Sequence, residues 1–481
     1  LIRIINFQRY YYQQKTNSKY LYIMNNKYFW FLAFLLITIN TQAQLNPVIT
    51  QWMQNTTQIG TYYMSGNSTP ISNNTLVNCQ KVEYSTTSVY VTATGIPAYP
   101  TGPFLDGNPS IAMNQDAIYK FTLTPQQNTG NPTPTTPGNI GVFINGVSLF
   151  DYRDGVAWNT NTSSLCGGPG NPPCPGGPGA TQAWNRDAVP AEMDGFDCSK
   201  GHPAMGNYHH HQNPSAFKLD LIVLSTICNL YDADGLYAID STLHSPLIGY
   251  AYDGFPIYGA YGYKNSDGTG GVERIKTGYQ LRNITVRTHH ADGTNVDDGP
   301  PVSNTYPLGY FREDYEWVSH SGNDDYLDEH NGRFCVTPEY PEGTYAYFCT
   351  VDEYWNSAYP YAVGPTFYGV YSNASVTTIS ENTTVYIPTV GISDEDFDSM
   401  DITIYPNPAS DLIAIQIGGL VEDNLEINLL DLSGRVIKQA TVNKGSTISY
   451  FDAQTLYAGT YIIQIVNGDN STSKKVVVLK R

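Results

Sequence analysis

The chain has 481 residues and carries 43 acidic against 25 basic side chains, a formal net charge of −18. A surface of that sign repels phosphate backbones, so we expect no nucleic-acid partner. Only 14% of the residues are charged, whereas 39 are Tyr, 43 are Gly and 30 are Pro. This composition argues against a helical cytosolic enzyme and predicts an all-β chain of short strands and long loops.

The first feature along the chain has the layout of a secretory signal. Met24 opens a short polar and basic start, residues 28–39 are apolar, and residues 41–43 place small side chains where cleavage occurs. About 12 apolar residues are too few for comfortable membrane spanning, although a buried core helix is an alternative reading. We expect residues 1–43 to be an upstream extension plus a signal peptide, and the mature chain to be secreted or surface-attached with no membrane span.

Residues 44–387 form the predicted main domain, which opens with a Thr/Asn-rich lead. Valine-rich alternation at residues 88–93 and 141–150 predicts strands, and helical periodicity is not sustained over more than about ten residues. The apolar segment 217–230 suits a helix or a buried strand equally well. A loop-rich, β-sandwich-like domain follows from these signals.

The seven cysteines belong to a chain that crosses an oxidising compartment, so they are candidates for pairing. Cys166 and Cys174 flank a Gly/Pro loop that a bridge would close. Cys335 and Cys349 would join adjacent strands across a turn at residues 341–343. The absence of a Cys-x-x-Cys pair gives little support to a cysteine-based zinc site.

The nine histidines all lie within residues 202–330, and three are consecutive. In an extended strand, alternate side chains share a face, so His209 and His211 would lie together with Cα atoms about 6.7 Å apart. Tyr208 and His210 would point the other way. Two imidazoles at this spacing can converge on one metal ion.

Two further residues extend this candidate site. His202 arrives from a loop across Gly206 as a third ligand, and Met205 offers a thioether if the metal is reduced copper. The sequence therefore favours a copper or zinc site at His202, His209 and His211. Two alternatives stay open: proton transfer without a metal, and structural histidines that hydrogen-bond neighbouring Tyr and Asp.

The same segment carries a family resemblance. Residues 208–211 read Tyr-His-His-His, which resembles the Tyr-His-Tyr-His motif of the YHYH protein family with His210 at the second Tyr. Ala346 and Phe348 stand where the family usually has a histidine, so no ligand is carried over there. The resemblance spans about residues 90–370 and implies kinship without a settled activity. Its other segments, in order, are Gly141–Val147, Gly201–Pro203, Ile248–Gly259, Leu327–Asp328, Asn331–Gly332, Glu339–Tyr347 and Tyr359–Tyr361.

Acidic residues offer further candidates. Asp253, with Tyr258 five residues on, either orients a ligand imidazole through its other nitrogen or caps a structural turn. Loop acids either hold calcium or are simply solvated, since none fits the regular twelve-residue calcium loop. These loop acids are Asp232 with Asp234, Asp292 with Asp297 and Asp298, and Asp324 with Asp325 and Asp328.

The C-terminal part reads as a separate unit. After an acidic linker at residues 388–401, residues 402–481 predict a small Ig-like β-sandwich, with strands at 402–405, 412–417, 425–430, 435–437, 459–466 and 475–479.

This unit closely resembles the type A sorting domain of the type IX secretion system of Bacteroidetes, with an ordinary Ig-like module as the alternative. The resemblance implies export to the cell surface or medium, with the secretion machinery as partner through residues 402–481. The matching segments are Tyr405–Pro408, Asp431–Val436, Leu456, Gly459–Tyr461 and Lys474–Lys480.

The sequence thus predicts a secreted or surface protein with a histidine-based site for copper or zinc. A metal-assisted extracellular hydrolase or oxidase is one alternative, and it needs an open coordination position for water. An adhesin with purely structural histidines is the other. Nucleotide-binding and serine-hydrolase motifs are absent, so whether the chain is an enzyme stays open.

Overall fold

The computed structural model describes residues 45–55, 57–67, 69–104, 106, 110–177, 181–214, 236–237, 239, 241–387, 402–417, 424–443, 448–467 and 470–479. The predicted signal peptide, the apolar segment 217–230 and the acidic linker lie outside these residues. Within them the chain is nearly all β, as predicted. The described helices are short and none could cross a membrane; they are α2 (Pro47–Thr50), α3 (Ala188–Ala191) and the 3₁₀ turns η1 (Met193–Gly195) and η4 (Arg312–Asp314).

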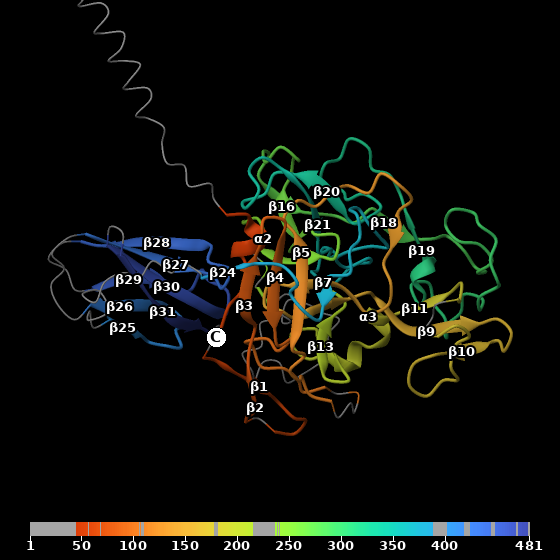
Figure 1. The fold of residues 1–481 in the computed structure, drawn as a ribbon, viewed down its shortest axis with the longest axis horizontal. Coiled ribbons are helices and arrows are strands. Elements are labelled where there is room, and N and C mark those ends of the chain that lie inside the picture. Colours follow the sequence, from red (N-terminus) through yellow and green to blue (C-terminus); the bar gives the residue numbers. More distant parts are fainter. Residues whose placement is uncertain are drawn as a thin grey trace, which may run out of the picture. The chain divides into compact units, whose positions relative to one another are not determined.

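The largest sheet contains eight strands in the order β12-β13-β8-β7-β14-β15-β21-β20. Its central strand β14 is buried at every position, which explains why its sequence is a continuous apolar run. Several of its strands are labelled in Figure 1. The bounds are β7 (Asn139–Phe143), β8 (Ser148–Phe150), β12 (His202–Ala204), β13 (Asn207–His210), β14 (Leu247–Ala251), β15 (Pro256–Tyr258), β20 (Gly332–Cys335) and β21 (Thr344–Phe348).

A five-stranded sheet in the order β23-β5-β4-β3-β24 packs on the same core. Trp52 stacks on Phe121 of β5 at 5.4 Å between ring centroids and lies 5.5 Å from Tyr250 of β14, so one aromatic cluster joins both sheets. The predicted strand at residues 88–93 is β4. The bounds are β3 (Cys79–Tyr84), β4 (Ser88–Ala93), β5 (Ala117–Thr122), β23 (Ser375–Val376) and β24 (Thr384–Tyr386).

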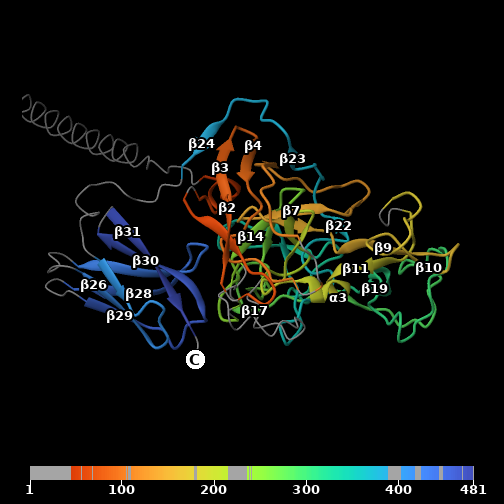
Figure 2. The ribbon, with the colours of Figure 1, turned by 90° about the horizontal axis from the view of Figure 1, so that it is seen from below.

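A three-stranded sheet, β10-β9-β11, leads directly into helix α3 (Figure 2). Asp187 ends β11 and caps α3, because its Oδ1 accepts a hydrogen bond from the Val189 amide at 3.0 Å. The bounds of this sheet are β9 (Arg153–Asn159), β10 (Ser164–Cys166) and β11 (Asn185–Asp187).

Small two-stranded ladders complete the described part of the main domain. They pair β1 (Ile59–Tyr62) with β2 (Ile71–Leu76), β6 (Thr133–Pro134) with β22 (Thr366–Phe367), β16 (Tyr261–Tyr263) with β17 (Val272–Arg274), and β18 (Tyr279–Leu281) with β19 (Tyr315–Trp317).

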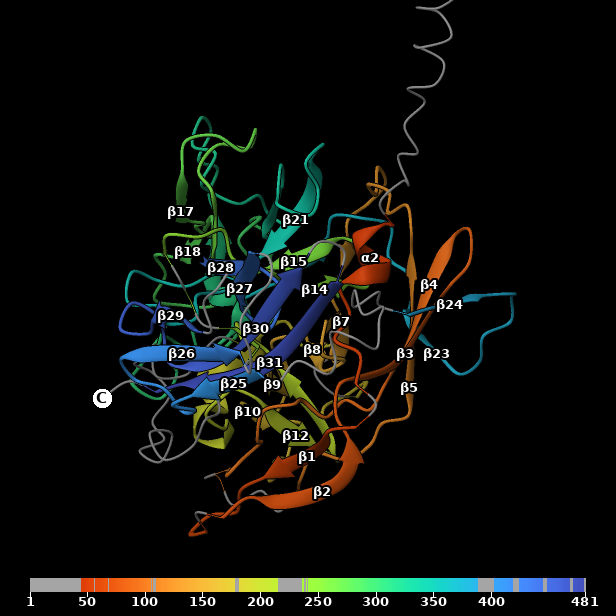
Figure 3. The ribbon, with the colours of Figure 1, turned by 90° about the vertical axis from the view of Figure 1, so that its left-hand side faces the viewer.

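The C-terminal region has its own apolar core between two sheets, of order β25-β26-β29 and β28-β27-β30-β31 (Figure 3). This matches the predicted Ig-like sandwich, to which the structure adds the strand β29. The bounds are β25 (Ile402–Tyr405), β26 (Leu412–Ile417), β27 (Leu425–Leu430), β28 (Val436–Val442), β29 (Ile448–Asp452), β30 (Gly459–Asn467) and β31 (Asn470–Val478).

The hairpin β12–β13 carries the histidines. Its turn residues Met205 and Gly206 both have positive φ, at 49° and 88°, as a tight two-residue turn between strands requires. The turn sets the register, which places His202 opposite His209. Strand β13 then pairs in parallel with β8, with His209 beside Ser148, and this pairing joins the hairpin to the large sheet.

Candidate metal centre

Three imidazoles converge at this edge of the sheet. One ring nitrogen each from His202, His209 and His211 lies within 4.8 Å of the others. All three residues are buried, with exposed fractions of 8%, 2% and 4%. The predicted alternation is present, since His209 and His211 share a face. His202 lies on a strand rather than a loop and reaches the group through the hairpin register.

Backbone hydrogen bonds fix the orientation of two of these rings. His209 Nδ1 lies 2.9 Å from the Asn207 carbonyl oxygen, and His211 Nδ1 lies 2.6 Å from that of Asp151. A carbonyl oxygen only accepts, so each Nδ1 carries the proton and each neutral ring directs the lone pair of Nε2 inward. This arrangement is typical of metal-ligating histidines.

The inward nitrogens of His209 and His211 face each other at 3.1 Å. Two lone pairs at that distance repel unless a proton or a metal cation lies between them. The geometry therefore calls for a positive charge at the centre of the cluster.

Glu192, which the sequence analysis did not single out, supplies a carboxylate to the same point. Its Oε2 lies 3.4 Å from His202 Nε2 and 3.3 Å from His211 Nε2. Both Glu192 Oε2 and His202 Nε2 are buried without a hydrogen-bond partner. Glu192 follows α3 ten residues before His202, and no spacing rule connects a four-residue helix to a distant hairpin.

The pKa values of the three imidazoles are shifted in different directions by their surroundings. Burial lowers the pKa of His202 to about 4, and burial with the neighbouring imidazoles lowers the pKa of His209 well below its usual range. Burial also disfavours the charged form of His211, but the Glu192 carboxylate outweighs it and raises the pKa of His211. Of the three rings, His211 is therefore the one on which the surroundings most favour a proton when no metal is bound.

Aromatic side chains line the cluster. Phe150 stacks on His209 with ring centroids 3.8 Å apart and an interplanar angle of 19°. Phe196 contacts the edge of His202 at 4.9 Å. These rings restrict the imidazole rotamers and make the surroundings of the ligand nitrogens apolar.

On the opposite face of β13, the polar atoms of His210 and Tyr208 all have hydrogen-bond partners. His210 has both nitrogens paired, Nδ1 with the Lys200 carbonyl at 3.0 Å and Nε2 with the Tyr99 hydroxyl at 2.9 Å. Tyr208 donates to Asp197 at 2.9–3.0 Å. Tyr208 and His210 point away from His209, as predicted, and their role is structural.

The structure corrects three predictions about the surroundings of the site. Met205 is 96% exposed at the tip of the hairpin turn, so its thioether does not face the imidazoles. Asp253 does not orient a ligand, because its Oδ2 accepts from the Tyr347 hydroxyl at 2.6 Å and the Gly369 amide at 2.8 Å. Tyr258 donates to Glu339 at 2.8 Å, also away from the cluster.

The structure confirms one of the two disulfide predictions and contradicts the other. Cys166 and Cys174 form a disulfide as predicted, and Cys198 is disulfide-bonded too. Cys335 and Cys349 are free and buried, so the predicted bridge is wrong. They do lie on or beside adjacent strands, but Cys335 pairs with Thr344, five residues before Cys349. An offset of about 16 Å along a strand cannot be bridged by a disulfide.

The loop acids Asp324, Asp325 and Asp328, suggested for calcium, have protein partners. Asp324 accepts from Ser266 at 2.9 Å, and Asp325 pairs with Lys276 at 2.6 Å. Asp328 accepts from the Tyr345 hydroxyl at 2.9 Å. Asp232 and Asp234 lie outside the described residues. Within the described part of the chain, the cluster suited to a metal is the histidine group.

Comparison with known protein families identifies both regions. The YHYH protein family matches residues 118–359, half of the chain, and the chain belongs to this family. The secretion system C-terminal sorting domain matches residues 403–479. The protein is therefore secreted or displayed at the cell surface, with the type IX secretion machinery as the partner of its C-terminal domain.

Individual relatives are distant. An endo-acting ulvan lyase from Formosa agariphila is 26% identical over 116 residues, which cover 22% of this chain and 22% of that enzyme. Dimeric latent PorU from Porphyromonas gingivalis matches with a TM-score of 0.15 and 18% identity, over 23% of this chain and 11% of that one. The chain spans about a fifth of the length of the curated relative it matches.

Proposed function

We propose that the YHYH domain of this exported protein binds one divalent transition metal, copper or zinc, through His202, His209 and His211. The observation that carries this proposal is the pair of inward Nε2 atoms 3.1 Å apart, each on a ring whose Nδ1 is bound to a backbone carbonyl. A divalent cation converts this repulsive contact into two ligand bonds.

The adhesin alternative requires histidines that satisfy their hydrogen bonds within the protein. His210 meets that requirement, since both its nitrogens are paired. Of the three converging histidines, His202 does not, because its Nε2 is buried without a hydrogen-bond partner. This difference between neighbouring histidines supports metal binding over a purely structural role.

The test is the metal content of the mature chain purified without a His tag, measured by mass spectrometry after incubation with zinc or copper. We expect about one equivalent in the wild type and almost none in the double variant His209→Ala/His211→Ala. A matched control, His289→Ala/His290→Ala, removes two adjacent histidines elsewhere and should keep the metal. Stoichiometric metal in the His209/His211 variant would refute the proposal.

A further inference from the structure

The carboxylate of Glu192 lies against the imidazoles of the proposed metal site, and its role as a ligand rests on that proposed site. Glu192 Oε2 is a buried anionic atom that lies 3.3 and 3.4 Å from two imidazole nitrogens and makes no hydrogen bond. A buried carboxylate oxygen without a hydrogen bond is costly unless a cation contacts it.

The distances identify the kind of contact. A charge-assisted hydrogen bond between a carboxylate and an imidazolium would measure about 2.7–2.9 Å. In a tetrahedral site with bonds of about 2.0–2.1 Å, neighbouring ligand atoms instead lie about 3.3–3.4 Å apart. Of the six edges of such a tetrahedron, the contacts of Glu192 with His202 and His211, at 3.4 and 3.3 Å, fit, and the 3.1 Å between His209 and His211 is close. The three imidazole nitrogens lie within 4.8 Å of one another, which is wider than a tetrahedral edge, so the rings must move closer together around a bound ion.

From this geometry we propose that Glu192 is the fourth ligand, so that one divalent ion is held by three imidazole nitrogens and one carboxylate oxygen. No coordination position is then left for water. The complete ligand set is His202, His209, His211 and Glu192.

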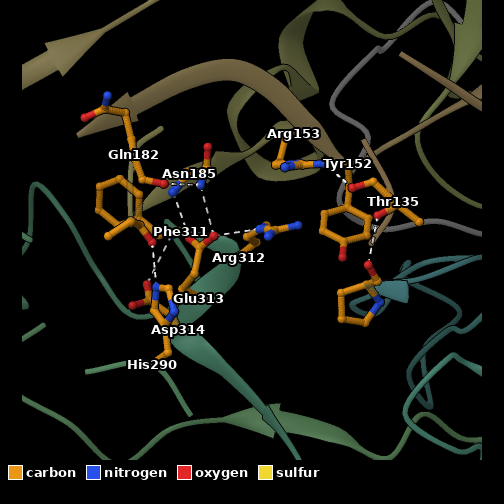
Figure 4. Close-up of polar contacts among 12 residues, drawn as sticks. Thr135, Tyr152, Arg153, Gln182, Asn185, His290, Phe311, Arg312, Glu313 and Asp314 are labelled. Carbon is orange, nitrogen blue, oxygen red and sulfur yellow. Dashed lines mark hydrogen bonds and ion pairs between the residues drawn. The ribbon is translucent and has the colours of Figure 1, made fainter. Parts of the chain in front are cut away.

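The segment that presents Glu192 is firmly anchored. The Glu192 amide donates to the Ala188 carbonyl at 2.8 Å, which ties Glu192 to helix α3. Asp187, the cap of α3, also accepts from the Tyr361 hydroxyl at 2.6 Å. Two residues before Asp187, Asn185 is held by Glu313, whose carboxylate accepts hydrogen bonds from both its backbone amide and its side chain (Figure 4). The carboxylate is therefore preorganised before an ion arrives.

The ligand set selects a class of ion. Three neutral imidazoles and one carboxylate suit a borderline dication such as zinc, cupric copper or cobalt. Calcium takes six to eight oxygen ligands, and cuprous copper prefers sulfur, which the exposed Met205 does not provide here.

A closed four-ligand site has a structural consequence. The ion would join the β12–β13 hairpin to the α3–η1 segment, and through the His211–Asp151 hydrogen bond it would also hold the residues after β8. These connections are absent when the metal is absent. The site thus serves to retain the ion and brace the domain, rather than to activate water for hydrolysis.

Cobalt(II) is the probe, because four-coordinate cobalt absorbs visible light strongly and higher-coordinate cobalt absorbs weakly. We expect the full mature chain to bind one cobalt with strong visible absorption. Glu192→Gln should bind at least tenfold more weakly and absorb weakly, because water enters the vacated position. The control Asp194→Asn removes a neighbouring exposed carboxylate and should match the wild type in affinity and spectrum.

The outcomes distinguish the two proposals. Wild-type affinity and spectrum in Glu192→Gln would overturn the fourth ligand and leave the histidine site intact. If the wild type binds neither cobalt, zinc nor copper, the metal site itself is refuted. Circular dichroism of metal-free Glu192→Gln and of Asp194→Asn checks that both variants fold, so that a lost signal is a lost ligand.

Discussion

The two faces of strand β13 carry the same residue type in opposite circumstances. The Nε2 atoms of His209 and His211 face each other, and that of His211 also faces the Glu192 carboxylate, whereas His210 between them has both nitrogens paired with hydrogen-bonding oxygens. Burial is nearly equal on the two faces, with exposed fractions of 2%, 4% and 0%. A histidine-rich run therefore does not define a site by composition; the partners of each ring nitrogen do.

The largest effect is expected from replacing one histidine on each face of β13 in the metal-free protein. His210→Leu leaves the Tyr99 hydroxyl and the Lys200 carbonyl without their partner, and should lower the free energy of unfolding by about 3 kcal/mol. His209→Leu removes a ring held close to other imidazoles and should change the free energy of unfolding by less than about 1 kcal/mol. Urea unfolding measures both. Equal losses would mean that the two faces play the same role.

The stability of the metal-free protein should also depend on pH through His210. Burial lowers the pKa of His210 to about 3, while the unfolded chain takes up this proton near 6.5. The unfolded state therefore binds more protons between pH 6.5 and about 3, and the contribution of His210 to stability is lost as the pH falls through that window. At pH 5 the loss is about 2 kcal/mol. We expect a shallower decline from pH 7 to 5 in metal-free His210→Leu; an unchanged slope would contradict it.

The smallest expected effect concerns Asp253, which lies outside the cluster. Asp253→Asn replaces one acceptor oxygen facing the Tyr347 hydroxyl and the Gly369 amide, and should reduce the free energy of unfolding by about 1 kcal/mol. Its metal content should equal that of the wild type, because no ligand depends on it. A variant that folds but lacks metal would show that Asp253 orients the site after all.

Local signals in the sequence predicted a large part of this molecule. Strand alternation separated His209 and His211 from His210, because it depends only on the extended backbone. The sorting domain was found from strand-length patterns and its motifs, and the Cys166–Cys174 bridge from a short loop. Each of these features involves residues close together in the chain.

Predictions that needed long-range register were less successful. The Cys335–Cys349 bridge had the correct neighbouring strands but the wrong register, and an offset of five residues along a strand leaves no trace in composition. For Asp253 the sequence left two roles open, orienting an imidazole or capping a turn, and its partners Tyr347 and Gly369, which come from distant parts of the chain, exclude the first.

The all-β character, the sorting domain and the shared face of His209 and His211 follow from the amino-acid sequence, because strand geometry repeats every two residues and the sorting motifs are contiguous. The position of His202 opposite His209, the hydrogen bonds from two Nδ1 atoms to backbone carbonyls and the proximity of Glu192 are known only from the folded domain. These contacts depend on the register of a hairpin and the position of a short helix from another part of the chain. Packing of the whole domain fixes both, and no local spacing does.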